Sequence, residues 1–153
     1  MMWSVGSHIG SFMLTLEENK LAVSDYLMLR KKVGWKKLSE DQAKKALDNS
    51  LYILTARLDG ELVGMGRIVG DGSVICYVQD LIVAPDAQGK KVGSTILKKL
   101  TDYVNGLRET GTEMMFCLMC AKGRETFYEK HGFTARPTDN LGPGMIVYLN
   151  EQE

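Results

Sequence analysis

Residues 88–94, Gln-Gly-Lys-Lys-Val-Gly-Ser, have the composition of an anion-binding loop. They follow an apolar run that ends at Val83, and a helical pattern begins at Val92. The first turn of a helix has unpaired backbone N–H groups and the positive end of the helix dipole, so it attracts phosphate oxygens. Glycine lets a pyrophosphate approach the backbone, and lysine adds positive charge. The candidate phosphate-binding residues are Gln88, Gly89, Lys90, Lys91, Val92, Gly93 and Ser94.

The loop also fits a purely structural role, because Gly-x-x-x-Gly at a helix start suits tight packing of a helix on a sheet. Two nucleotide-binding motifs do not match it. A Walker loop needs Gly-Lys-Ser or Gly-Lys-Thr, and a dinucleotide loop follows the first strand of a parallel sheet. The sequence on either side of the loop is therefore needed to predict which anion the loop would bind.

Composition limits the remaining function classes. The 153 residues include 19 Lys and Arg and 19 Asp and Glu, so the balanced charge favours neither nucleic acid nor a membrane as a partner. We expect a cytoplasmic protein, because no apolar stretch is long enough to span a bilayer and no signal peptide is visible. The Cys117-x-x-Cys120 pair lies in a strand-like run without a second ligand pair, so we expect free thiols and no metal site.

Hydrophobic periodicity predicts one α+β domain over residues 12–153. Residues 1–11 look like an expression-tag remnant or a disordered segment, and we set them aside. Ser39 and Gln42 form a capping-box pattern, and Asp59-Gly60 is a hairpin signal. The expected helices are 24–33, one from 39, 92–107 and 124–130. The expected strands are one before the first helix, 51–58, 62–68, 74–83, 113–119, 133–135 and 145–149.

The loop and its context resemble the GNAT superfamily of N-acetyltransferases. Residues 88–94 match the family's Gln/Arg-x-x-Gly-x-Gly/Ala pyrophosphate loop after a strand, and residues 127–133, Phe-Tyr-Glu-Lys-His-Gly-Phe, match its Tyr-Glu-Lys-x-Gly-Phe helix end. The tail around residues 142–145 also resembles that of many members. The resemblance covers roughly residues 14–149. It implies a mixed, mostly antiparallel, twisted sheet of about six to seven strands with about four helices, splayed centrally to hold acyl-CoA.

The resemblance also implies the cofactor and its contacts. Acetyl-CoA would be the co-substrate, with its pantetheine arm paired to the backbone of Leu81, Ile82 and Val83 and with Phe127 beside it. A backbone N–H near Leu81 or Ile82 would stabilise an oxyanion. Tyr128 would be the general acid that protonates the leaving thiolate, because a phenol stays protonated at neutral pH.

Two departures from the family pattern affect these assignments. Lys91 stands where the family has its first glycine, so phosphate binding requires that this position does not demand a positive φ. Ala121 stands where an asparagine is common. The general base is open: the usual glutamate position holds Tyr77, the nearest carboxylate is Asp80, and a water chain ending at either would suffice. Strict alternation places Tyr77 and Asp80 on opposite faces, whereas the family's bulge in this strand reverses the parity.

The acceptor-binding residues are expected around the first two helices. The resemblance makes that segment one wall of the acceptor cleft, with Tyr26, Trp35 and Tyr77 as candidate contacts, although Trp35 could equally be a core residue. Acidic residues such as Asp71, Asp80 and Asp139 favour a small amine as the acceptor. We therefore predict acetyl transfer to a primary amine through a ternary complex, with a non-catalytic acyl-CoA sensor as the alternative. An exposed sheet edge would permit a homodimer.

Overall fold

The structure of this chain, a computed structural model, describes residues 5–9 and 12–151. Its contacts divide it into two compact units, Met1–Leu118 and Met119–Glu153, which are described separately. No helix within the described residues is long and apolar enough to cross a lipid bilayer.

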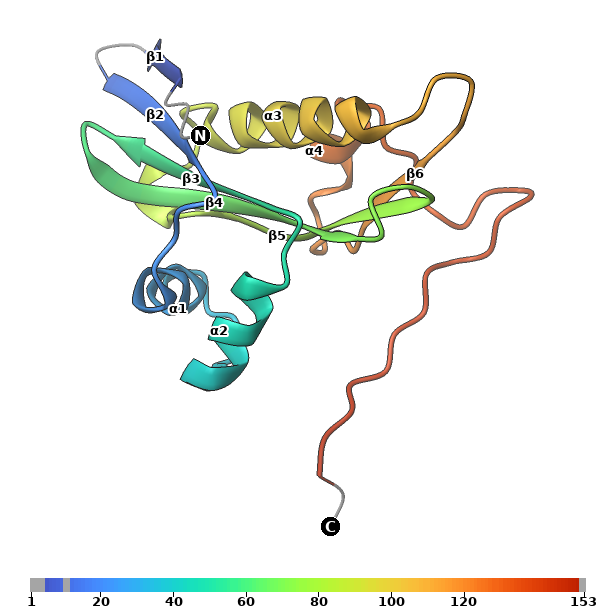
Figure 1. The fold of residues 1–153 in the computed structure, drawn as a ribbon, viewed down its shortest axis with the longest axis horizontal. Helices are drawn as coiled ribbons and strands as arrows, with labels where there is room; N and C mark the ends of the chain where they lie inside the picture. Colours follow the sequence, from blue (N-terminus) through green and yellow to red (C-terminus); the bar gives the residue numbers. More distant parts are fainter. Residues whose placement is uncertain (1–4, 10–11, 152–153) are drawn as a thin grey trace. The chain divides into compact units, whose positions relative to one another are not determined.

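The described part of the first unit is built on one six-stranded sheet whose spatial order follows the chain (Figure 1). Neighbouring strands are antiparallel, except that β5 and β6 are parallel. This arrangement confirms the predicted α+β class with a mixed, mostly antiparallel sheet. The strands are β1 (Val5–Ile9), β2 (Phe12–Glu18), β3 (Tyr52–Leu58), β4 (Glu61–Gly70), β5 (Ile75–Val83) and β6 (Met115–Leu118).

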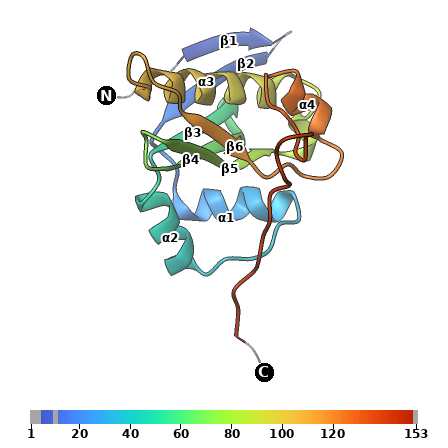
Figure 2. The same cartoon turned by 90° about the vertical axis from the view of Figure 1, so that its right-hand side faces the viewer.

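Helices cover both faces of this sheet (Figure 2). α1 (Val23–Lys32) and α2 (Glu40–Asp48) pack on one face, and α3 (Val92–Leu107) packs on the other. The Ser39 hydroxyl accepts a hydrogen bond of 3.0 Å from the backbone N–H of Gln42, so the predicted cap of α2 is confirmed.

Two turns join the central strands, the first of them as predicted. Asp59 and Gly60, between β3 and β4, have φ values of 49° and 84°, which are typical of a two-residue hairpin turn. Between β4 and β5, Asp71 Oδ1 accepts hydrogen bonds from the backbone N–H groups of residues 73–75. These bonds, with that of Ile75 first, lower the pKa of the Asp71 carboxyl group. Asp71 therefore stabilises the turn between β4 and β5.

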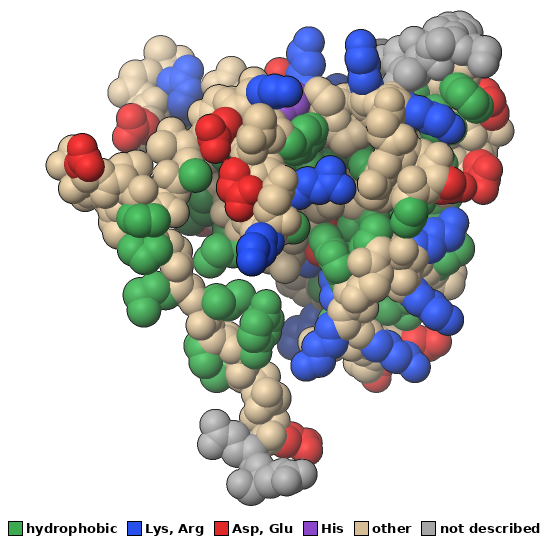
Figure 3. Space-filling model, turned by 180° about the vertical axis from the view of Figure 1, so that it is seen from behind, with side chains coloured by type: hydrophobic (Ala, Val, Ile, Leu, Met, Phe, Trp, Pro, Cys, Tyr) green, Lys and Arg blue, Asp and Glu red, His purple; other side chains and the backbone are tan. Residues whose placement is uncertain are grey.

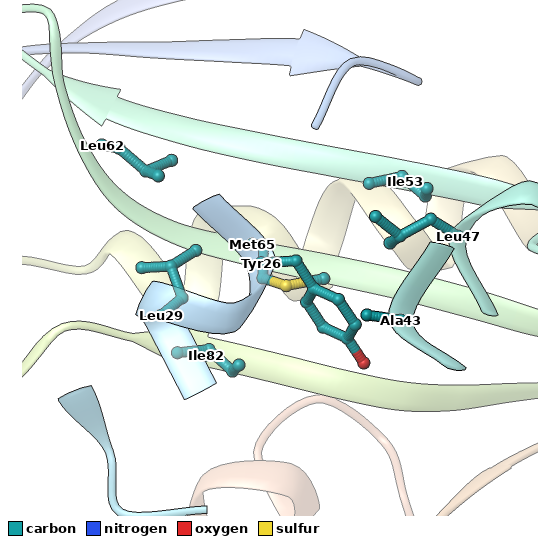
Figure 4. Packing of buried hydrophobic residues seen from close by; sticks show 8 residues of the cluster. All are labelled: Tyr26, Leu29, Ala43, Leu47, Ile53, Leu62, Met65 and Ile82. Atoms are coloured by element: carbon teal, nitrogen blue, oxygen red, sulfur yellow. The ribbon is translucent and has the colours of Figure 1, made fainter. Parts of the chain in front are cut away.

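The core between the sheet and the first two helices is almost entirely apolar. Figure 4 shows side chains from α1, α2 and three strands converging on one another, with the Tyr26 hydroxyl as the polar atom among them. Burial of each large apolar side chain stabilises the fold by about 1.5–3 kcal/mol. The cluster consists of Tyr26, Leu29, Ala43, Leu47, Ile53, Leu62, Met65 and Ile82.

On the other face, two glycines of β4 allow α3 to approach the sheet closely. A Cβ atom at Gly66 would lie 2.7 Å from side-chain atoms of both Ile96 and Leu100. A Cβ atom at Gly64 would lie 2.7 Å from the carbonyl oxygen of Ile82. Both distances are shorter than van der Waals contact allows. The absence of a side chain at Gly66 thus lets α3 pack closely on β4.

The N-terminal segment that we set aside contributes a strand. Residues 5–9 form β1, which pairs with β2 so that Val5 lies opposite Leu16 and Ile9 lies opposite Phe12. Residues 1–4 and 10–11 of that segment lie outside the described residues. The expectation of a segment apart from the fold therefore does not hold for residues 5–9. A ladder is formed by backbone groups, which small polar residues carry like any others.

The second unit contains α4 (Glu125–Glu129), close to the predicted helix, and no strand among its described residues. The strands predicted for 133–135 and 145–149 are therefore wrong. Pro137 lacks an N–H group and follows residues 133–135 closely, which disfavours a ladder there. Residues 145–149 have the composition of a strand, but residues 119–151, the described part of this unit, contain no neighbouring strand with which to pair.

Replacing Gly66 with alanine is expected to lower the free energy of unfolding by about 1–3 kcal/mol, because the new methyl group overlaps side chains of α3. Gly106 is the matched control, since a Cβ atom there meets nothing within 4 Å. Gly106→Ala should raise the free energy of unfolding by about 0.5–1 kcal/mol through helix propensity. Urea unfolding followed by circular dichroism measures both. Equal stability of the two variants would contradict the close packing of α3.

Candidate active site

The junction between β5 and α3 contains the start of a long helix. A short 3₁₀ turn, η1 (Pro85–Ala87), leads out of β5, and α3 begins at Val92 without a side chain that caps its first turn. The first N–H groups of a helix have no acceptor within the helix, so this end can bind an anion. Gly89 has a φ of 78°, which glycine adopts without strain. The predicted phosphate-binding residues, 88–94, all lie at this junction.

Lys91 precedes α3 in a left-handed conformation, with φ 62° and ψ 16°. This conformation costs a residue with a side chain about 1–2 kcal/mol relative to glycine. The position therefore does demand a positive φ, so the condition that we set for phosphate binding is not met, and any binding by this loop has to tolerate a strained Lys91. The loop nevertheless turns into α3, and the backbone strain lies at Lys91, the residue that replaces a family glycine.

Two side chains of the loop fold back onto the sheet. Lys90 Nζ lies 4.4 Å from the centroid of the Phe12 ring in β2, a cation–π contact worth about 0.5–1 kcal/mol at an exposed site. Gln88 Nε2 donates a hydrogen bond of 3.2 Å to the carbonyl oxygen of Val83. These contacts connect the loop to β2 and to the end of β5.

β5 extends beyond its pairing with β6. The parallel ladder joins residues 75–78 to residues 115–118, whereas β5 continues to Val83. Among the described residues, no strand pairs with residues 79–83 on that edge. The sheet therefore opens beside the loop that leads to α3, as the resemblance implied.

Backbone alternation shows which groups of β5 point to the open edge. The N–H of Ala84 donates to the carbonyl oxygen of Val63 in β4, at 2.7 Å. In an antiparallel ladder the bonding direction alternates, so the N–H of Ile82 also points toward β4. The N–H groups of Leu81 and Val83 point the other way, toward the open edge.

A β-bulge at Gln79 decides which face each side chain of β5 joins. Arg67 pairs with Asp80 and Ile68 pairs with Val78, so Gln79 is an extra residue in β5. Paired residues share a face and neighbours in β4 alternate, so Asp80 and Val78 lie on opposite faces. This confirms the prediction that a bulge in this strand places Tyr77 and Asp80 on the same face of the sheet. The side chains facing α1 and α2 are Tyr77, Asp80 and Ile82, and those facing α3 are Cys76, Val78, Leu81 and Val83.

Asp80 lies in a buried network of two guanidinium groups and a phenol. Its side chain is 1% exposed, and Oδ2 accepts hydrogen bonds from the Tyr26 hydroxyl at 2.6 Å and from Arg67 Nε at 2.8 Å. Arg30 Nη1 lies 3.5 Å from Oδ1. Arg67 Nη1 also donates to Ser50 Oγ at 3.2 Å. A carboxylate at this depth needs such partners, because an unpaired buried charge is strongly destabilising.

Two buried atoms of this network, Asp80 Oδ1 and Arg30 Nε, have no hydrogen-bond partner among the described residues. Asp80 Oδ1 is therefore the carboxylate oxygen that a water molecule or an amine could still use. Burial, followed by the charge of Asp80, raises the pKa of the Tyr26 phenol. Tyr26 thus remains a hydrogen-bond donor to Asp80 at neutral pH.

The three predicted acceptor contacts lie on this same side of the sheet and differ in exposure. Tyr26 is buried, Tyr77 is half-buried, and Trp35 is 37% exposed. Arg30 Cζ lies 5.4 Å from the ring centroid of Trp35 and 5.7 Å from that of Tyr26. The structure therefore joins Tyr26 and Asp80 directly, with Arg30 linking them to Trp35, the most exposed of the three aromatic residues.

Tyr128 and Phe127 lie in α4, in the second unit. The ring of Tyr128 meets those of Phe127 and Phe133 edge to face, with centroids 5.0 and 5.9 Å apart. Burial, followed by the nearby thiol of Cys120, raises the pKa of Tyr128 above its ordinary value of 10.0. Within its unit, Tyr128 is thus a half-buried phenol that keeps its proton at neutral pH.

Sequence reasoning missed Arg30 and Arg67, the two partners of Asp80. Arg67 carried a signal, because it is a charged residue inside the apolar run of residues 62–68 and such a residue needs a buried counter-ion. Arg30 carried no comparable signal, since a basic residue near a helix C-terminus is common on the surface.

We predict that Arg67→Met lowers the free energy of unfolding by about 3–5 kcal/mol, because it leaves a buried carboxylate without its closest cation. The double variant Arg67→Met with Asp80→Leu should recover much of this loss, since a pair of apolar residues tolerates burial. Denaturant unfolding of the wild type, the two single variants and the double variant forms a thermodynamic cycle. Strictly additive losses would show that the two side chains do not interact.

Comparisons with known proteins identify the family to which this fold belongs. A model of the acetyltransferase (GNAT) domain matches residues 49–135. A ycf52-like N-acetyltransferase of Prochlorococcus marinus is 32% identical over 73% of this chain, and the match spans 62% of that relative's length.

Two solved bacterial structures have the same fold. A GNAT-family acetyltransferase of Streptococcus pneumoniae is 30% identical, with a TM-score of 0.76 over 91% of this chain and all of the other. A probable acetyltransferase of methicillin-resistant Staphylococcus aureus is 27% identical, with a TM-score of 0.79 over 90% of this chain and all of the other. Because the domain match covers more than half of the 153 residues, from β3 through α4, this chain belongs to the GNAT family of acetyltransferases.

Proposed function

We propose that this protein transfers the acetyl group of acetyl-CoA to the amino group of a small primary amine, by direct attack within a ternary complex. The observation that carries the proposal is the open edge of β5 leading directly into the uncapped N-terminus of α3. A strand edge suits an extended amide-containing arm, and a helix N-terminus suits a pyrophosphate. One segment of about fifteen residues thus offers both kinds of contact in sequence.

The residues present fit the cofactor. The backbone of Leu81 and Val83 would pair with the pantetheine amides, and the first-turn N–H groups of α3 would bind the pyrophosphate. Lys90 and Lys91 supply local positive charge in a chain with no net charge. When bound, acetyl-CoA supplies an activated acetyl thioester. The strained Lys91 affects affinity through its backbone conformation and leaves the chemistry of the thioester unchanged.

Three groups of the chain would support the reaction. The Leu81 N–H points to the open edge of β5, where it would donate to the oxyanion that develops on the thioester carbonyl. Tyr128 would protonate the departing thiolate, a role that rests on the family resemblance and on its raised pKa. Asp80 Oδ1, which has no hydrogen-bond partner among the described residues, would take the amine's proton, through water where the amine does not reach it.

The acceptor is proposed to enter beside α1, over the network around Asp80. Trp35, with its exposed ring, would contact the body of the amine, and Tyr77 lies on the same face of the sheet. Tyr26 would position Asp80, because its buried hydroxyl is already bonded to that carboxylate. This arrangement suits a small amine, whose body an aromatic side chain can hold while its nitrogen lies near a carboxylate.

The strain at Lys91 gives a test of the loop itself. Lys91→Gly and Lys91→Ala both remove the charge and differ only by a Cβ atom, so their comparison isolates the backbone effect. We expect the glycine variant to be more stable toward urea by about 1 kcal/mol, because φ is positive at this residue. An alanine variant of equal or greater stability, as at ordinary positions, would show that the loop does not require the left-handed conformation.

Thermal unfolding with acetyl-CoA tests cofactor binding. At a ligand concentration near 100 Kd, binding stabilises the fold by about 2.7 kcal/mol, which for a domain of this size raises Tm by about 5–10 °C. Gly93→Trp should abolish the rise by blocking the helix start. Gly106→Trp is the control in the same helix, at a site open to solvent, and should keep the rise. No rise in the wild type would reject the cofactor assignment.

Turnover then separates an enzyme from a sensor. Release of free coenzyme A thiol is measured with a panel of small amines, and Tyr128→Phe should lower kcat while leaving the thermal response to acetyl-CoA unchanged. Binding of acetyl-CoA without acetylation of any amine would contradict the proposed transferase activity and favour an acyl-CoA sensor.

A further inference from the structure

The face of the sheet that carries Asp80 holds more positive charge than negative. Among the described residues, Asp80 is the one carboxylate that forms an ion pair with Arg67 or with Arg30, whose side chain is only 13% exposed. Two guanidinium groups thus share a single carboxylate, which leaves an excess positive charge in a largely buried place. Such a charge is costly unless an anion balances it.

Arg30 is the cation of this pair that retains free hydrogen-bonding capacity. Arg67 Nε lies 2.8 Å from Asp80 Oδ2, whereas Arg30 Nη1 lies 3.5 Å from Asp80 Oδ1. Arg30 Nη2 donates a hydrogen bond of 2.9 Å to the carbonyl oxygen of Lys36, and the buried Nε of Arg30 has no hydrogen-bond partner among the described residues. A guanidinium group has five N–H donors in a planar fork that matches a carboxylate or a phosphate. Arg30 therefore has donors left for an anionic group.

The surface around Arg30 is also basic. Residues 26–39, from α1 to the residue before α2, include five Lys and Arg and no Asp or Glu. Figure 3 shows Lys and Arg side chains gathered over this part of the first unit. The exposed lysines of the segment are Lys31, Lys32, Lys36 and Lys37. A chain without net charge thus concentrates positive charge beside α1, where it would attract an anion.

The acidic residues that favoured a small amine in the sequence do not offset this charge. Asp71 accepts hydrogen bonds from the backbone of its own turn between β4 and β5, and Asp139 belongs to the second unit. Asp80 is outnumbered by its two arginine partners. The charges around Asp80 therefore favour an acceptor that brings a negative charge of its own.

We propose that the acceptor is an amine that also carries an anionic group, a carboxylate or a phosphate, and that Arg30 binds this group. The inference rests on the proposed acetyl transfer and names the class of its acceptor. Asp80 Oδ1, which would take the amine's proton, lies 3.5 Å from Arg30 Nη1, so the amine and the anionic group would be only a few bonds apart. The acceptor is thus a compact zwitterion, and the Trp35 ring, 5.4 Å from Arg30 Cζ, lies beside its anionic end.

Binding to the protein saturated with coenzyme A tests this proposal without turnover. Three matched pairs of amines differ in the anionic group: glycine and glycinamide, phenylalanine and phenylalaninamide, and phosphoethanolamine and ethanolamine. In isothermal titration calorimetry, the anionic member of at least one pair should bind about 10–100-fold more tightly than its neutral partner, as expected of one charge-assisted hydrogen bond. The pair that responds distinguishes a carboxylate from a phosphate. Anionic members that bind no more tightly than their neutral partners in all three pairs would overturn the proposal.

Variants then test the role of Arg30. Arg30→Gln should remove most of the preference for the anionic member, whereas Lys98→Gln, which removes one exposed charge of α3 on the opposite face of the sheet, should retain it. Because Arg30→Gln also removes a contact of α1, the exposed pair Lys36→Gln and Lys37→Gln gives a second readout. This double variant should bind the anionic member severalfold more weakly at low salt, with the difference lost at high salt. A folded Arg30→Gln variant that keeps the full preference would overturn the proposal.

Release of coenzyme A thiol separates this inference from the proposed function. Acetylation of the neutral members as fast as the anionic ones would overturn the anionic acceptor and leave acetyl transfer standing. Preferential binding of an anionic member without acetylation of any amine would contradict the proposed transfer and leave the anion-binding role of Arg30 standing.

Discussion

One extra residue in β5 determines how the first unit is organised. Gln79 shifts the register against β4, so Tyr77, Asp80 and Ile82 face α1 and α2 while Leu81 and Val83 face α3. Without the bulge, Asp80 would lie on the face of α3, away from Tyr26. Asp80, the buried carboxylate, and Leu81, whose N–H would contact the thioester at the open edge, are therefore consecutive residues of a single strand. A bulge re-aims side chains in this way because the pleat has a period of exactly two residues.

The helices of the first unit pack against the two faces of the sheet that contains β5. Glycines in β4 bring α3 close to the sheet, which places the start of that helix directly after the open part of β5. On the opposite face, Tyr26 and Arg30 of α1 reach Asp80, so the first helix is held to the strand by polar contacts in an otherwise apolar core. The proposed cofactor and acceptor sites thus depend on packing more than on any single catalytic side chain.

Local signals in the sequence predicted most of the elements. Ser39 with Gln42, Asp59 with Gly60 and the apolar face of residues 92–107 each act through neighbours in the chain, and each is present in the structure. The features that could not be predicted from the sequence depend on contacts between distant parts of the chain. The register shift at Gln79 was implied only by resemblance, the pairing of Asp80 with Arg30 joins residues fifty apart, and residues 145–149 read as a strand although a ladder also needs a partner.

The central claim is that the N–H groups at the start of α3 and at the open edge of β5 bind acetyl-CoA. The most direct measurement is the shift of backbone amide resonances in nitrogen-15 NMR spectra during titration with coenzyme A. The account predicts the largest changes at Gly89, at residues 91–94 and at Leu81, with Gly106 at the far end of α3 unchanged. Saturation of binding with these amides unmoved and the largest changes elsewhere would contradict it.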